Sequence, residues 1–416
     1  MPHVKPTPIV AMARKSAGRL FLAFLAVQTA VAGTLVLIDA VKHRNRAHRP
    51  GFPHPGVFDA RVADSDVTVY TYGEDLYRDM LAAIHGAKRS IFLETFIWKD
   101  DATGRRFKEA LADAAERGIE VYVVYDGFAN LVVPRSFYRF HPGIHVYRFP
   151  VLRPSRLFTP LRSAGLDHRK ILVVDDETGF VGGYNIGDLY ATEWRDTHVR
   201  ITGPSVWDLR QAFVGVWNTV TADPEIPHLP PQAWDPHIRA VNNIPSHLVY
   251  PIRGVYLDAI NRAQHHIYIT TAYFIPDQQI LQALLSASKR GVDVRIILPE
   301  DSNHVLSDWL SRGFYTSMLR AGVTVLLYRN AMIHAKTATI DGHWSTVGTA
   351  NIDRLSLTGN YETNLEIHDE ALAADMERIF GVDSANCREL TLDDWSERHF
   401  AAPISETILI PLRPFL

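Results

Sequence analysis

The chain of 416 residues has one cysteine, Cys387, so no disulfide can form within it. It also has no excess of charge: 43 lysine and arginine residues against 46 aspartate and glutamate residues give a formal net charge of −3. Because binding to a nucleic-acid backbone relies on many basic contacts, this balance argues against a nuclease and against nucleic acid as a partner. The lone cysteine is interpreted as an ordinary residue rather than a nucleophile.

Metal-binding patterns are absent as well. The chain has 19 histidines but no His-Glu-x-x-His, no pair of cysteines and no cluster of acidic residues at ligand spacing. We therefore expect no metal site and no cofactor. Hydrophobic residues make up 47% and charged residues 21% of the chain, which is typical of a packed globular protein and excludes a disordered one.

One long hydrophobic run lies near the N-terminus, where residues 20–38 include no charged residue. At about 1.5 Å rise per residue such a helix nearly spans a hydrocarbon core of about 30 Å. We therefore predict an N-terminal tail over 1–19, a transmembrane helix over 20–41 and a basic linker rich in proline and glycine over 42–66. A cleavable signal peptide is the alternative, but the apolar sequence continues beyond the small residues that resemble a cleavage site.

The remainder of the chain is duplicated. Residues 116–125 (ERGIEVYVVY) correspond to residues 289–298 (KRGVDVRIIL), and several prolines crowd between the two copies at 222–236. Strand-like and helix-like segments alternate in each copy, which predicts an α/β fold with mainly parallel sheets flanked by helices. We place a first half at 67–228 and a second half at 229–416.

Both halves contain the pattern His-x-Lys-x4-Asp-x6-Gly-x-x-Asn. The first copy is formed by His168, Lys170, Asp175, Gly182 and Asn185, and the second by His334, Lys336, Asp341, Gly348 and Asn351. Five fixed residues coincide by chance about once in a few million starting positions at ordinary residue usage. Two copies at corresponding places in a duplication therefore predict a functional site.

A carboxylate follows each motif at the same offset. Asp196 lies 28 residues after His168, and Glu362 lies 28 residues after His334. The shared offset predicts a carboxylate partner for each histidine, which would fix the tautomer and orientation of the ring.

These residue types suit phosphodiester chemistry. A neutral imidazole is a nucleophile near pH 7, and a protonated imidazole can release an alcohol leaving group. Two ammonium groups and two carboxamides can stabilise the charge on the phosphoryl oxygens, and backbone amides at Gly182 and Gly348 could approach the same anion. Asp175 and Asp341 are assigned to the catalytic set, with a turn-capping role as the alternative.

The two motifs are those of the phospholipase D superfamily, and the flanking segments resemble bacterial cardiolipin synthases. The resembling segments are 100–105, 125–127, 182–188, 272–277, 292–299 and 348–353. The resemblance implies two α/β halves related by a pseudo-two-fold axis, with one His-Lys-Asn set from each half at a single site. It also implies a covalent phosphatidyl-histidine and no metal, with His168 as the nucleophile and His334 as the acid.

The expected function is cardiolipin synthesis from two phosphatidylglycerols with release of glycerol. Phospholipids are the expected substrates and the membrane the expected partner, with no obligate protein partner and a single-pass location in a bacterial inner membrane. Hydrolysis of phospholipids to phosphatidic acid remains an alternative, and a nuclease a weaker one. An insertion over 150–166, in which arginines alternate with apolar residues, is either an interfacial element or a plain surface loop.

Overall fold

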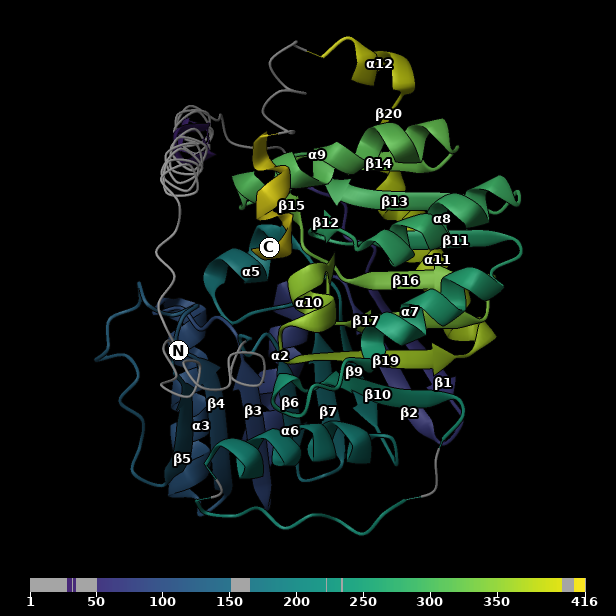
Figure 1. Ribbon diagram of the computed structural model, residues 1–416. Coiled ribbons are helices and arrows are strands. Elements are labelled where there is room, and N and C mark those ends of the chain that lie inside the picture. The colour runs from purple at the N-terminus through teal and green to yellow at the C-terminus, as the bar shows by residue number, and fades with distance from the viewer. Residues whose placement is uncertain are drawn as a thin grey trace, which may run out of the picture.

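A computed structural model describes residues 28–31, 33–34, 51–150, 165–221, 223–232, 235–398 and 408–415. Two eight-stranded sheets dominate it, one in each half of the chain (Figure 1). Most of the predicted transmembrane segment over 20–41 and most of the 150–166 insertion lie outside the described residues. Within the described ranges, no helix is both long enough and apolar enough to cross a membrane.

The first sheet has the strand order β1-β2-β9-β7-β6-β3-β4-β5. Its strands are β1 Val57–Val62, β2 Ser65–Tyr70, β3 Ser90–Thr95, β4 Glu120–Asp126, β5 Ile144–Phe149, β6 Ile171–Val174, β7 Thr178–Gly182 and β9 His198–Thr202. The strands β3, β4 and β6 are buried along their whole length or nearly so, which fits their unbroken apolar sequences.

The second sheet has the order β10-β19-β17-β16-β11-β13-β14-β20. Its strands are β10 Ile238–Asn243, β11 His266–Thr270, β13 Asp293–Pro299, β14 Thr324–Tyr328, β16 Thr337–Ile340, β17 Trp344–Gly348, β19 Glu362–His368 and β20 Cys387–Leu390. Seven strands therefore repeat the order of the first sheet, from β10 in place of β2 to β14 in place of β5. The repeat in the sequence is a repeat in the fold.

The prediction of mainly parallel sheets was wrong. In the first sheet only the β3–β4 and β4–β5 pairs are parallel, and in the second only β11–β13 and β13–β14. The motif strand β6 instead turns directly into β7 and pairs antiparallel with both β7 and β3. A tight turn replaces the crossover helix that a parallel connection would need, so each sheet is mixed.

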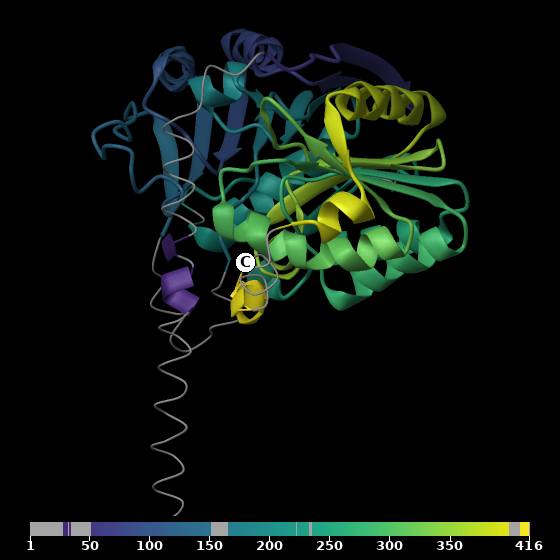
Figure 2. The same cartoon turned by 90° about the horizontal axis from the view of Figure 1, so that it is seen from above.

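Helices cover the outer faces of the sheets and fill the space between them (Figures 1 and 2). They are α2 Gly73–Gly86, α3 Ala102–Glu116, α5 Asp188–Thr192, α6 Val206–Val220, α7 Pro251–Arg262, α8 Gln278–Lys289, α9 Val305–Arg320, α10 Arg354–Thr358, α11 Glu370–Ala385 and α12 Leu392–Ser396, with 3-10 turns η2 Pro245–His247 and η3 Ile410–Phe415. Asp101 caps α3 and Asp277 caps the corresponding α8, each by accepting backbone N–H groups.

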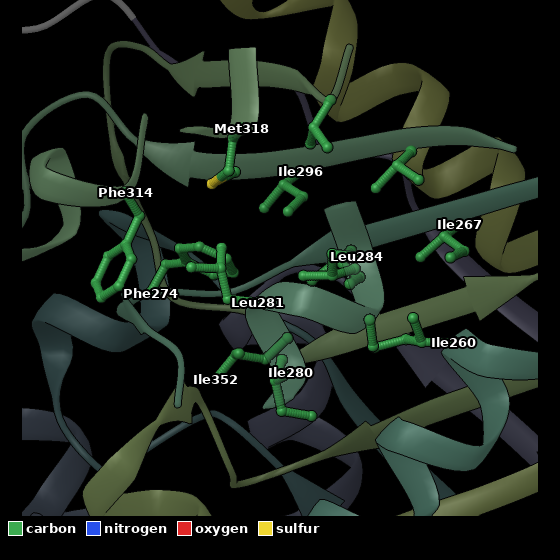
Figure 3. Packing of buried hydrophobic residues seen from close by; sticks show 14 of the residues in the cluster. Ile260, Ile267, Phe274, Ile280, Leu281, Leu284, Ile296, Phe314, Met318 and Ile352 are labelled. Atoms are coloured by element: carbon green, nitrogen blue, oxygen red, sulfur yellow. The ribbon is translucent and has the colours of Figure 1, made fainter. Parts of the chain in front are cut away.

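Three large apolar clusters hold these layers together. One lies on the outer side of each half, and Figure 3 shows that of the second half, where Leu284 of α8 packs over Ile267 and Ile296 of the sheet. The third cluster contains residues of both halves, including Phe213 of α6 and Met376 of α11. Since burying apolar area is the main driving force for association, this shared core fixes one half against the other.

Candidate active site

Each motif histidine is held in place by the backbone of the opposite half. The amide of His168 donates to the carbonyl of Tyr361 at 3.1 Å, and the amide of His334 donates to the carbonyl of Arg195 at 2.6 Å. Beside the His334 bond the strand β8 Trp194–Arg195 runs parallel to β15 Met332–Ile333, and beside the His168 bond Asp167 forms a parallel bridge with Tyr361. The two histidines therefore sit where a strand end of each half meets its counterpart from the other half.

The carboxylates cross over in the same way. Glu362 of the second half accepts from Nδ1 of His168, with Oε2 at 3.0 Å, and Asp196 of the first half lies with Oδ2 2.6 Å from Nδ1 of His334. All four side chains are buried. Each histidine thus has the predicted carboxylate partner, but the partner comes from the other motif.

The hydrogen bonds around Glu362 favour one tautomer of His168 when that carboxyl is ionised. The backbone N–H of Thr363 donates to Oγ1 of Thr349 at 2.9 Å, so the hydroxyl hydrogen of Thr349 points to Oε2 of Glu362. That same oxygen lies 3.0 Å from Nδ1 of His168, and in its ionised form Glu362 accepts from both neighbours. With Glu362 ionised, the ring of His168 donates from Nδ1 and keeps a lone pair on Nε2, which is the form a nucleophile needs.

Around Asp196 the arrangement is different. Its Oδ1 accepts from the backbone N–H of Thr197 at 2.7 Å, while Oδ2 faces His334. Burial raises the pKa of Asp196 to about 6 and that of Glu362 to about 8. Asp196 is therefore the more readily ionised partner, and an ionised carboxylate stabilises an imidazolium more strongly.

Both lysines face this centre and are buried. The ammonium of Lys170 donates to the carbonyl of His168 at 2.7 Å, and that of Lys336 donates to the carbonyl of His334. Burial lowers the pKa of Lys170 to about 7 and that of Lys336 to about 8. Two ammonium groups held without water favour a bound anion, and the anion in turn would restore their charge.

The pKa of each motif histidine lies well below its ordinary value. Burial is the main cause for His168, followed by Lys170 and Lys336; for His334 burial is followed by Lys336, Lys170 and the ring of His168. The lysine of the other half lowers the pKa of each histidine, so the two His-Lys pairs share one electrostatic environment. Both rings are neutral in the empty site near pH 7.

Aromatic rings line the two histidines. Phe96 lies edge-on to His168 with ring centroids 4.6 Å apart, and Trp194 lies 5.0 Å from His334. The ammonium of Lys170 is 5.1 Å from the centroid of the Phe96 ring. The rings of Phe96 and Trp194 exclude water from the imidazoles. Neither residue could be identified from the sequence, because a single aromatic residue forms no motif.

The motif asparagines lie in the same buried region. Oδ1 of Asn185 accepts from the amide of Ile97 at 3.2 Å, whereas Oδ1 of Asn351 is buried without a hydrogen-bond partner. A Cβ on Gly182 or on Gly348 would come within 2.5 Å of the backbone of the neighbouring strand. The amide of Gly348 donates to the carbonyl of Lys336, so the geometry assigns the two glycines to strand packing.

The structure does not bring Asp175 and Asp341 to the histidines. Both follow the motif strand at its far end, with positive φ angles of 56° and 52°. Asp175 accepts from the amides at positions 88–90, and Asp341 from those at positions 264–266. Each carboxylate thereby accepts from three backbone amides at the start of a central strand. This is the turn-capping role that the sequence left open as the alternative to a catalytic one.

Sequence reasoning also missed His198, which is buried beside the site with no hydrogen-bond partner on either ring nitrogen. Its counterpart in the second half is Asn364, whose carboxamide accepts from the amide of Ala350 at 3.1 Å. The only available signal was position, since each of these residues lies two places after the paired carboxylate. Across the described ranges, no group of three or more histidine, cysteine or acidic side chains is arranged to hold a metal ion.

Comparison with known proteins agrees with this geometry. A family model described as "Cardiolipin synthase, PLD-like domain" matches residues 80–217 and 256–383, so that each match contains one copy of the motif. The cardiolipin synthase of Clostridium perfringens strain SM101 is 32% identical over 378 residues, covering 85% of this chain and 77% of that protein. The major cardiolipin synthase ClsA of Bacillus subtilis strain 168 is 33% identical over 369 residues, covering 85% and 76%.

Among solved structures, a phosphatidylserine synthase of Haemophilus influenzae Rd KW20 aligns with a TM-score of 0.62 over 86% of this chain and 94% of that chain. At 15% sequence identity this likeness concerns the fold alone. The family model matches both halves of the chain, and two cardiolipin synthases that are more than 30% identical to it cover 85% of its length. The paired site agrees with these matches. The chain therefore belongs to the cardiolipin synthase family with PLD-like domains.

Proposed function

We propose that this protein is a phosphatidyltransferase that makes cardiolipin from two molecules of phosphatidylglycerol and releases glycerol. The observation that carries the proposal is the crossed pair of carboxylate–histidine contacts inside one buried site with two lysines. The cardiolipin synthases to which the chain is similar point to the same substrate class.

The first half-reaction forms a covalent intermediate. Nε2 of His168 attacks the phosphorus of the first phosphatidylglycerol, and the bond between phosphorus and the headgroup glycerol oxygen breaks. His334, which takes up a proton when the anionic lipid binds, gives that proton from Nε2 to the glycerol oxygen, so neutral glycerol leaves. Glu362 stabilises the positive charge on the phosphorylated ring of His168, and the two lysines stabilise the phosphoryl oxygens.

The second half-reaction reverses the roles around the phosphorus. The headgroup hydroxyl of a second phosphatidylglycerol gives its proton to Nε2 of His334, and its oxygen attacks the phosphorus. The bond between phosphorus and Nε2 of His168 breaks, which yields cardiolipin and free His168. One phosphodiester replaces another, so excess glycerol should drive the reaction backward.

The asymmetry of the two pairs supports this assignment of roles. His334 has the more acidic carboxyl as its partner, since the pKa of Asp196 is about 6 and that of Glu362 about 8. An acid catalyst needs its protonated form stabilised, which an ionised Asp196 does best. The Thr349 hydroxyl bond, in contrast, supports the Nδ1–H tautomer of His168 that a nucleophile requires.

The cellular setting is part of the proposal. The apolar run over 20–38 supports a single membrane-spanning anchor in a bacterial inner membrane, and the boundary between the halves is placed at 228–229. In the bilayer plane an acceptor lipid is already concentrated, which favours a lipid alcohol over water as the acceptor.

The decisive experiment gives purified full-length protein phosphatidylglycerol alone in mixed micelles and identifies the products by mass. We expect cardiolipin and glycerol in equal amounts, in the presence of a chelator and without nucleotide. Phosphatidic acid as the dominant product across detergents and lipid levels would instead make the protein a phospholipase. His265→Ala, at an exposed position outside the site, is the matched control for handling losses.

The assignment of roles has its own test. With His334→Asn the second step lacks its base, so a phosphate-labelled phosphatidyl-p-nitrophenol, whose leaving group needs no proton, should leave label on His168. Label found on His334 in the His168→Asn variant, and absent from His168 in the His334→Asn variant, would reverse the two roles.

A further inference from the structure

The turn that follows β4 exposes an unusual group of apolar side chains. Val132 is 83% exposed, Leu131 57% and Phe128 52%, more than any other large apolar side chain among the residues that the structure describes. We call these three residues the apolar tip. Exposed apolar side chains scattered singly are ordinary, whereas three within five residues require an explanation.

The apolar tip is built on a rigid turn. Oδ1 of Asp126 accepts from the amides of Phe128 and Ala129, at 2.8 and 2.9 Å. The carboxamide of Asn130 is fully used: it accepts from Trp98 N and donates to the carbonyls of Phe96 and Asp126, and the side chain is buried. Because this polar frame fixes the turn, the three apolar side chains are held outward and cannot fold back into the core.

The same frame connects the apolar tip to the active site. Oδ2 of Asp126 accepts from the amide of Asp167, the residue directly before His168. Asn130 holds the carbonyl of Phe96, the residue whose ring lies against His168. The apolar tip therefore has a fixed position at the rim of the site.

The stretch of sequence that contains the apolar tip carries charge of one sign. From residue 127 to residue 166 the sequence contains no aspartate or glutamate. It contains six arginines in that stretch, at positions 135, 139, 148, 153, 156 and 162. Arg135 and Arg139 are exposed on the same loop as the apolar tip, in a protein whose net charge is −3. Apolar side chains flanked by arginine fit an anionic phospholipid surface.

The second half has a different element at this place. There the chain between β13 and β14 forms helix α9, whose buried residues include Leu310 and Phe314. The first half has instead the long loop between β4 and β5, at the outer edge of its sheet (Figure 1). At this connection the first half therefore carries an outward apolar turn, whereas the second half carries a helix.

We propose that the apolar tip inserts into the surface of an anionic phospholipid bilayer, with Arg135 and Arg139 on lipid phosphates, and so sets the active site against the headgroups. The insertion deepens the proposed function by naming the surface from which substrate enters. It differs from the predicted transmembrane helix over 20–41, because it orients the catalytic body rather than tethering it.

A local probe tests the insertion, because the N-terminal apolar segment would by itself keep the whole chain on vesicles. Val132→Cys is labelled with a polarity-sensitive fluorophore in the full-length protein and reconstituted into phosphatidylglycerol vesicles. Burial raises the pKa of the Cys387 thiol to about 12, so labelling is selective for the introduced thiol. Val57→Cys is the matched control, since Val57 is an exposed valine (42%) on β1, at the opposite edge of the same sheet.

The probe at position 132 should be quenched by nitroxides on the lipid chains and shielded from iodide, whereas the probe at position 57 should show the reverse. Vesicles of zwitterionic lipid should give weaker quenching, because they lack the negative charge that the arginines bind. Equal iodide access at both positions in phosphatidylglycerol vesicles would overturn the proposal. So would shielding at position 132 without lipid quenching, which would assign the apolar tip to a protein contact.

An activity measurement separates this proposal from the proposed function, on which it rests. The triple variant Phe128→Ser, Leu131→Ser and Val132→Ser should lose about tenfold or more of its turnover on phosphatidylglycerol vesicles. It should keep the wild-type rate on short-chain phosphatidylglycerol below its critical micelle concentration. An equal loss on both substrates would contradict insertion, whereas wild-type protein without transfer on either substrate would contradict the proposed function and leave the quenching result standing.

Discussion

At the scale of single residues, each catalytic histidine is paired with a carboxylate from the other half of the chain. His168 depends on Glu362 and His334 depends on Asp196, so each motif is incomplete without a residue of the other half. The exchange is symmetric in position but not in chemistry, because the first half has Gly183 where the second has Thr349. A Cβ on Gly183 would collide with the Asp196 carboxylate at 2.0 Å, whereas Thr349 donates to Glu362.

Both histidines act on one phosphorus, so His168→Ala and His334→Ala should each lower kcat by about 10³- to 10⁶-fold. The double variant should be scarcely slower than either single one, because members of one catalytic unit are not additive. Turnover of labelled phosphatidylglycerol, with thermal unfolding as the check on folding, measures this. Residual activity near half of wild type in either single variant would mean two independent sites.

The carboxyl of Glu362 should matter through the tautomer of His168. Glu362→Gln replaces a carboxyl that can ionise with an amide that cannot and that can donate to Nδ1, so we expect kcat to fall by about 10- to 10³-fold with little change in KM. Thr349→Val, which removes only the hydroxyl that donates to Glu362, should cause a smaller loss in the same direction. A loss confined to KM in both variants would assign these residues to lipid binding instead.

The pH dependence follows from the two lysines. Burial lowers the pKa of Lys170 to about 7 and of Lys336 to about 8, so both lose their charge in the empty site as the pH rises through this range. Since the anionic substrate needs that charge, kcat/KM should fall from pH 7 to 9, while kcat, which reports the lipid-bound form, should fall at higher pH. Lys170→Arg should move the fall in kcat/KM to higher pH, because arginine stays charged throughout. A kcat/KM that is flat from pH 6 to 9 would contradict this assignment.

At the scale of elements, the turns after the motif strands β6 and β16 belong to stability. Asp175→Ala leaves three backbone amides at positions 88–90 without their acceptor, so the free energy of unfolding should fall by about 1–3 kcal/mol. Asp341→Ala should behave alike in the second half. Urea denaturation measures the loss, and kcat at low temperature should remain close to wild type. A large drop in kcat with unchanged stability would restore these residues to the catalytic set.

The sequence predicted some elements of the site and the fold correctly and others wrongly. The equal offset of Asp196 and Glu362 predicted a carboxylate for each histidine, and the resemblance to the phospholipase D superfamily implied that both motifs meet at one site. The direction of the pairing depends on β8 meeting β15 and on Tyr361 meeting Asp167, contacts between distant segments that no local pattern encodes. The sheets were expected to be mainly parallel because the tight turn between β6 and β7 was not distinguished from a crossover connection.

At the scale of the whole molecule, one buried ion pair joins the halves next to the site. Arg195 donates to both carboxylate oxygens of Asp383 on α11, at 3.0 and 2.8 Å, and its own carbonyl holds the amide of His334. Both side chains are buried, so removing one leaves the other charge without a partner in a dry interior.

Arg195→Met should therefore lower the free energy of unfolding by about 3–5 kcal/mol and reduce activity, since the backbone that positions His334 loses its support. Adding Asp383→Leu should recover much of the stability by removing the unpaired carboxylate. Arg262→Met, which removes an exposed pair with Asp258, is the control and should change little. Thermal unfolding measures all three, and a loss in Arg195→Met no larger than in the control would show that the pair does not couple the halves.

The crossed contacts have a consequence for how such a site can arise. A pairing in which each half supplies the carboxylate for the other half's histidine is one that a single half could make with an identical copy of itself. In such a pair every substitution would appear twice, so nucleophile and acid would be forced to share one environment. Joining the halves in one chain removes that constraint, because corresponding positions such as Gly183 and Thr349, or Asp196 and Glu362, can change independently. Two equivalent histidines can then take different roles, one as nucleophile and one as acid.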